Sequence, residues 1–296
     1  MKSSYIQQLS PDHPLASEAF DKALETLKRF NEERTAARSL ENDESAKLTQ
    51  ALYQPLLKQI SENPEASLAL EHLRHSRVHD TADFVKDLPV RDDQSSSTFL
   101  NLQLHEHLSF ANAPYDFDWN WGNSFDSLHN KAEGNIGIRG ASGHVQHGTS
   151  ARVEAAAGIG LIVTTDKPAS VQVRPFITYT WESLVVADGL FSSGEARGGI
   201  DAAAFLNGAI IKTSGVRRSE LFSSRSSSGT DRRSDGGIVW VPEVTLKFDI
   251  EPGQVVAVTF GAWIECDHTS GIGYGGGAGI VQAKVSWVVV DRLVAG

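Results

Sequence analysis

The sequence is poor in cysteine, in net positive charge and in long apolar runs. Its single cysteine, Cys266, cannot form an intramolecular disulfide, which favours a reducing compartment. A formal net charge of −10 disfavours binding to nucleic-acid phosphates and to anionic membrane surfaces. No stretch approaches the roughly 18 consecutive apolar residues that a membrane-spanning helix needs. We therefore expect neither a nucleic-acid partner nor a stable membrane span.

A secretory signal is also missing from the start of the chain. The first residues, Met1–Gln8, lack the apolar core of roughly 7–15 residues found in a signal peptide. The expected product is a soluble protein made in the cytoplasm without Sec export. Release by lysis or by a dedicated secretion system stays open.

Glycine and tryptophan are absent from the first third of the chain. The first of 26 glycines is Gly122, and the first of six tryptophans is Trp119. Residues 1–95 carry 29 charged residues, whereas the following 201 residues carry 35. This shift in composition predicts two parts: a helical N-terminal arm over 1–95 and a Gly/Trp-rich β domain over 96–296.

The arm has the apolar spacing of about three short helices. The first is expected over residues 15–30, the second from Asn42 through Leu56, and the third after Asn63-Pro64, because proline suits the first helical turn. Pro55 conflicts with the second helix, since an interior proline removes a hydrogen bond. Helices this short have little core of their own, so we expect them to pack on the β domain or on another subunit.

A two-residue rhythm begins near position 98. Val244, Leu246, Phe248 and Ile250 alternate with polar residues, as in antiparallel sheets with one buried face. Similar segments are expected near 98–107, 134–145, 151–164, 171–181, 198–212, 236–241, 256–266 and 281–289. About nine or ten such strands without intervening helices predict an antiparallel β-sandwich, of the jelly-roll or another Greek-key type. The expected fold class is mainly β with an α-helical N-terminal region.

The segment 151–164 is unusual because both of its rows are apolar or small. Val153, Ile159 and Val163 form one row, and the opposite row contains Gly158 and Ile162. A barrel strand with a lipid-facing row would have a more polar second row. A pore-forming toxin, with hairpins that insert into a membrane, is therefore one alternative function with weak support here.

The most distinctive segment runs from Tyr115 to Trp121 and alternates aromatic and polar residues. If it is extended, Tyr115, Phe117, Trp119 and Trp121 share one face. Aromatic platforms flanked by acids hold sugar rings in many β-sandwiches, so Asp116, Asp118, Trp119 and Trp121 are candidate ligand-binding residues. The competing interpretation places the aromatics in the core, where large rings are equally at home.

Two histidines form the candidate metal site. In His105-Glu106-His107 both imidazoles project from one face of the expected strand and could share a divalent metal. A solvated sheet surface is the competing interpretation, because Asn101 and Gln103 lie on the same face. No other cofactor is indicated.

A Ser/Arg-rich segment over 216–235 is predicted to be a flexible loop between strands. Its arginines could bind a phosphate or an acidic partner, although such a loop is more often a solvated tip. They are Arg217, Arg218, Arg225, Arg232 and Arg233.

Catalytic signatures are missing, so an enzyme is disfavoured. Gly271-Ile272-Gly273-Tyr274-Gly275-Gly276 matches a dinucleotide fingerprint in letters only, because no helix is expected after it; a loop between strands is predicted instead. We expect a non-catalytic binding or assembly module, whose sandwich presents loops to a carbohydrate or a protein and whose helices dock or form a homo-oligomer. A metal-dependent or carboxylate-based enzyme is the first alternative, and the pore-forming toxin the second.

Overall fold

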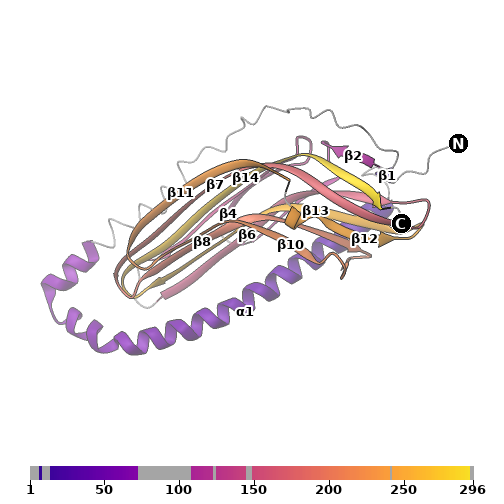
Figure 1. Cartoon of the computed structure of the whole chain (residues 1–296). Coiled ribbons are helices and arrows are strands. Elements are labelled where there is room, and N and C mark those ends of the chain that lie inside the picture. Colours follow the sequence, from indigo (N-terminus) through magenta and orange to yellow (C-terminus); the bar gives the residue numbers. More distant parts are fainter. Residues whose placement is uncertain are drawn as a thin grey trace.

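Two antiparallel sheets face each other as a sandwich, and helices precede them in the chain (Figure 1). The computed structural model describes residues 7–8, 14–72, 108–122, 125–144, 149–240 and 242–293. The fold class predicted from the sequence is confirmed. Among the described residues, no helix is long and apolar enough to cross a membrane.

The first sheet, called sheet A, has the strand order β1-β6-β13-β8-β10, with β3 also pairing β6 and β9 pairing β8. Its strands are β1 (Gln7–Gln8), β3 (Phe117–Gly122), β6 (Thr149–Thr164), β8 (Ser193–Leu206), β9 (Ala209–Ile210), β10 (Val216–Ser226) and β13 (Val255–Ser270). The pairing of β13 with β6 runs from Val255 opposite Thr164 to Ser270 opposite Thr149. Sheet A is therefore held by an unusually long central ladder.

The second sheet, called sheet B, has the order β11-β7-β14-β5-β4, with β12 also pairing β7 and β2 pairing β14. Its strands are β2 (Leu108–Asn112), β4 (Phe125–Asn130), β5 (Asn135–His144), β7 (Ala169–Leu190), β11 (Gly229–Trp240), β12 (Leu246–Ile250) and β14 (Ile272–Leu293). The described residues thus contain seven strands in each sheet, more than the nine or ten expected in total.

Part of the difference comes from the Ser/Arg-rich segment, where the prediction of a flexible loop is wrong. Residues 216–226 form β10 and residues 229–240 form β11, which belong to different sheets. On β10 the Ser224 side chain is buried, and its hydroxyl lies 2.9 Å from that of Ser183 on β7. A serine row can therefore line a strand when a partner hydroxyl satisfies it. The glycine-rich segment after Gly271, also expected as a loop, lies almost entirely within β14.

The main core lies between the two sheets and is built from alternating side chains. Strand β12 shows this most simply, because Leu246, Phe248 and Ile250 are buried whereas Lys247 and Asp249 are exposed. A second, smaller apolar cluster lies on the outer face of sheet A, where the helix α1 covers it. Helix α1, sheet A and sheet B therefore form three successive layers.

The helical arm is more continuous than predicted. Helix α1 (Pro14–Ser61) spans 48 residues and runs through Pro55, so the first two expected helices are one element. Residues 64–72 are also helical, as expected from Asn63-Pro64. The Asn63 Oδ1 accepts hydrogen bonds from the backbone N–H groups of Glu65 at 3.1 Å and Ala66 at 3.2 Å, which is the geometry of an N-cap.

Candidate functional site on the helical arm

Helix α1 has two segments with different surroundings. The proximal segment, residues 19–35, packs on the outer face of sheet A, where Ala23 is 1% exposed and Leu27 is 3% exposed. These two side chains join Phe205 and Trp263 of the sheet in one apolar cluster. Figure 1 shows α1 running along the sandwich, with its far end beyond the ends of the strands. The proximal segment is therefore a fixed third layer.

The second apolar row of β6 is explained by this layer. Gly158 and Gly160 leave room for aromatic rings of β3, because a Cβ at Gly158 would lie 2.6 Å from the Trp119 ring. Gly261 on β13 would meet the same ring at 2.8 Å. The glycines of β6 and β13 thus leave space on the outer face of sheet A, and the Trp119 ring packs into that space.

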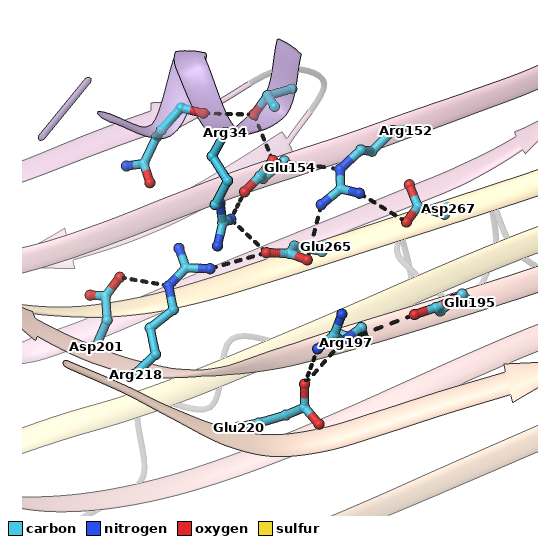
Figure 2. A network of polar contacts seen from close by, with 12 residues as sticks. Arg34, Arg152, Glu154, Glu195, Arg197, Asp201, Arg218, Glu220, Glu265 and Asp267 are labelled. Atoms are coloured by element: carbon cyan, nitrogen blue, oxygen red, sulfur yellow. Dashed lines mark hydrogen bonds and ion pairs between the residues drawn. The ribbon is translucent and has the colours of Figure 1, made fainter. Parts of the chain in front are cut away.

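A network of charges anchors the proximal segment more deeply (Figure 2). Arg34 points from α1 to Glu154 on β6 and to Glu265 on β13, and its Nη2 lies 2.5 Å from Glu265 Oε1. The Thr35 hydroxyl donates to Glu154 Oε2 at 2.6 Å. Both glutamates are only 2% exposed, and buried carboxylates are tolerated only when they are paired.

Two arginines of the sheet complete the network. Arg152 Nη2 lies 3.0 Å from Glu265 Oε2, and its Nη1 lies 3.2 Å from Asp267 Oδ2. Arg218 Nη1 lies 3.0 Å from Glu265 Oε1, and the guanidinium carbon stands 4.4 Å from the Trp263 ring centroid. Glu265 therefore receives three arginines, one of them from the helix, and links α1 to three strands.

Asp201 lies at the edge of this network, and its pKa is raised. Burial raises its pKa to about 7, and the positive charge of Arg34 opposes that rise. Arg218 Nε lies 3.7 Å from its Oδ2, which is too long for a strong hydrogen bond. The cost of burying the charge therefore outweighs the nearby cations at this position.

The distal segment of α1, residues 40–61, has a largely exposed surface. Leu40, Leu48 and Leu52 are 65%, 66% and 69% exposed. Tyr53 faces the other way, stacks on Phe191 at the end of the sandwich with ring centroids 4.0 Å apart, and is 8% exposed. One ring contact thus fixes which side of this segment faces the sandwich, and the leucines lie on the side turned to solvent.

The aromatic segment predicted to bind a ligand is partly built into the scaffold. Trp119 is 3% exposed, and Asp116 is 6% exposed and accepts a hydrogen bond from the Ile162 backbone N–H at 2.6 Å. Tyr115 does not share the row, because it precedes β3 and its hydroxyl donates to Val285 O in the inter-sheet core. Asp118 and Trp121 are partly exposed. A carbohydrate site that uses these two residues stays a prediction.

The histidine pair of the metal hypothesis, His105 and His107, lies outside the described residues. Within the described part of the chain, no group of three or more His, Cys, Asp or Glu side chains is arranged to hold a metal ion. Cys266 and His268 project between the sheets, where the thiol lies 3.5 Å from Gly140 O. Burial raises the pKa of this thiol, so Cys266 is a packed, inert side chain.

The five arginines of the Ser/Arg-rich segment do not converge. Arg218 belongs to the buried network, whereas Arg232 pairs with Glu182 at 2.6 Å and Arg233 with Asp231 at 2.7 Å. Arg225 is exposed on β10, and Arg217 lines a separate pocket. Three of the five arginines lie on β10 of sheet A, and the other two lie on β11 of sheet B. This separation excludes a single site that uses all five.

Sequence reasoning missed the network that binds α1 to sheet A. Asp201 stands alone among small and apolar neighbours on β8, whereas Glu154 and Glu265 each have a charged residue two positions away, Arg152 and Asp267. An isolated acid in such a row is the available signal, because it needs a buried cation. The sequence gives no comparable sign that the cation is Arg34.

Comparisons with known proteins give this chain no family. No family model and no curated protein matches it. A search of solved structures returned the enzymatically active domain of tailspike protein 4 of bacteriophage CBA120, at 12% identity and a TM-score of 0.15, covering 63% of this chain and 19% of that one. It also returned a carbohydrate-binding module that recognises mannan, at 10% identity and a TM-score of 0.15, covering 62% of this chain and 99% of the module.

A third likeness is to infectious bursal disease virus of the Gt strain, at 9% identity and a TM-score of 0.14, covering 71% of this chain and 47% of that one. TM-scores this low carry no argument about fold or function. The interpretation of the arm therefore depends on the contacts within this chain.

Proposed function

We propose that the protein is a non-catalytic binding and assembly module in which the distal segment of α1 joins two copies of the chain. The observation that carries the proposal is the exposure of Leu48 and Leu52, 66% and 69%, on a helix whose opposite side is held by Tyr53. Large apolar side chains that recur at helical spacing in solvent are typical of an interaction surface.

A second copy is the occupant because the stripe is self-complementary. In an antiparallel pair centred between Leu48 and Leu52, each of these leucines lies against the other one from the second copy. Glu44 and Lys58, both exposed, then come within about 3 Å of each other along the helix axis, on the same flank of the pair. Apolar contact in the middle and opposite charges beside it are what an isologous helix pair needs.

The expected association is moderate. Removing a leucine side chain from water contributes about 1.5–3 kcal/mol, and the pair buries two leucines from each copy. Association costs about 4–15 kcal/mol in lost freedom of motion. These terms nearly offset each other, so the dimer should dissociate on dilution.

Light scattering coupled to size-exclusion chromatography tests the proposal on the full chain. We expect a concentration-dependent dimer for the wild type, and a monomer for the double variant Leu48→Glu/Leu52→Glu. The matched control is Leu293→Glu, which places the same charge on a 37% exposed leucine in the last strand; it should dimerise like the wild type.

Two results would overturn the proposal. One is a wild-type monomer at every concentration measured. The other is a dimer that the double variant retains, since that dimer would use a different surface.

A further inference from the structure

A pocket lies beside β10, the edge strand of sheet A, and is also lined by strands of sheet B. It has a volume of about 390 Å³ and is lined by residues of β7, the turn before β10, β10 itself, the short 3-10 helix η1 (Pro242–Val244) and β12. The lining residues are Gln172, Thr213, Arg217, Pro242, Thr245 and Lys247. Its size suits a ligand as large as a monosaccharide.

The charge of this lining has one sign. Arg217 and Lys247 are both exposed, and within the described part of the chain neither forms an ion pair with a carboxylate. Most other arginines of the sandwich do, including Arg218, the neighbour of Arg217. Asp291 stands opposite Gln172 in the pairing of β14 with β7, and its Oδ2 lies 3.5 Å from Arg174 Nη2. Two cations therefore meet at a pocket in a protein whose net charge is −10.

The remaining polar lining is neutral. Gln172, Thr213 and Thr245 offer an amide and two hydroxyl groups, which both donate and accept hydrogen bonds. Gln172 stands directly opposite Lys247 in the pairing of β12 with β7, so the charged and neutral groups belong to one surface. Cations beside such neutral groups match a ligand that carries both an anion and hydroxyls.

We propose that this pocket binds a small anionic polyol, namely a sugar that carries a phosphate or a carboxylate group. The Arg217 guanidinium offers paired N–H donors to two oxygens of the anion, and Lys247 adds a point charge. Gln172, Thr213 and Thr245 bind the hydroxyls. The proposal is independent of pairing through α1, since a chain that stays monomeric keeps the whole pocket.

Isothermal titration calorimetry on the full chain tests it with four probes: glucose 6-phosphate, glucuronate, glucose and inorganic phosphate. We expect binding of the sugar phosphate or the uronate, a loss of at least tenfold with glucose, and weaker affinity as salt rises. The variants Arg217→Gln and Lys247→Gln should each lose about tenfold. Arg225→Gln, an exposed arginine of the same strand outside the pocket, is the matched control and should bind as the wild type does.

The two anionic sugars distinguish the source of the charge. Tighter binding of glucose 6-phosphate assigns a phosphate, and tighter binding of glucuronate a carboxylate. No binding of either sugar would overturn the proposal, as would unchanged binding in the double variant Arg217→Gln/Lys247→Gln. Binding of inorganic phosphate as tight as that of the sugar phosphate would overturn the role given to the neutral groups.

Discussion

The two segments of α1 belong to one helix but have opposite environments. The proximal segment buries Ala23 and Leu27 and sends Arg34 into a charge network, whereas the distal segment leaves Leu48 and Leu52 in solvent. The distal segment has five leucines in 22 residues and the proximal segment two in 17, so the leucine-richer segment is the more exposed one. The difference shows that the surface beneath a helix, and not the helix sequence alone, decides which apolar residues become core.

Truncating one leucine in each segment should give the largest contrast. Leu27→Ala removes a 3% exposed side chain from the cluster that contains Trp263, and should lower the free energy of unfolding by about 3 kcal/mol. Leu48→Ala, the matched change in the distal segment, should alter it by less than about 0.5 kcal/mol. Urea denaturation of dilute, monomeric protein measures both. Equal losses would show that the two segments are packed alike.

Removing one buried acid should have the next largest effect. Glu265→Gln takes the negative charge away from three arginines and should cost about 2 kcal/mol, since the cations stay buried without their partner. Glu220→Gln is the control, because Glu220 pairs with Arg197 while its side chain is 40% exposed; surface pairs contribute about 0.5 kcal/mol. If urea denaturation gives similar losses for both variants, the network does not anchor the proximal segment.

The last effect depends on pH. Burial raises the pKa of Asp201 from its ordinary value of 3.8 to about 7. The folded state therefore holds this proton more tightly than the unfolded state, and its contribution to stability, complete below pH 3.8, is lost as pH rises towards 7. Asp201→Asn should remove that dependence and make the protein more stable than the wild type at pH 8.

Thermal unfolding of the wild type and of Asp201→Asn between pH 5 and pH 8 measures this difference. Parallel curves for the two proteins would contradict the assignment to Asp201. A difference that grows from pH 5 to about pH 7 and then stays constant would support it.

Regular alternation predicted the strands well, and local composition predicted the Ser/Arg-rich segment poorly. Leu246, Phe248 and Ile250 face the core as their spacing indicates. Serine favours turns by propensity, but Ser224 is buried opposite Ser183 of the other sheet. Strand formation in this segment depends on neighbours far away in the sequence, and a local pattern cannot reveal them.

The arm shows the same limit. The apolar spacing predicts one helix over residues 15–30 and a second from Asn42, yet α1 continues between them. Arg34 is held there by acids that lie 120 and 231 residues further along the chain. The sequence alone shows the helical spacing of the leucines in the proposed assembly surface. It does not show their exposure, since exposure depends on where the sandwich ends.

The sealed position of Cys266 has a practical consequence for experiments on this protein. Its thiol lies between the sheets and is 0% exposed, and burial raises its pKa, so little reactive thiolate forms in the folded state. A second cysteine on the surface can therefore carry a fluorophore or a spin label while the native one stays unmodified. With Lys47→Cys, at an exposed position beside the leucines, a dipolar or energy-transfer measurement can report the distance between two arms directly.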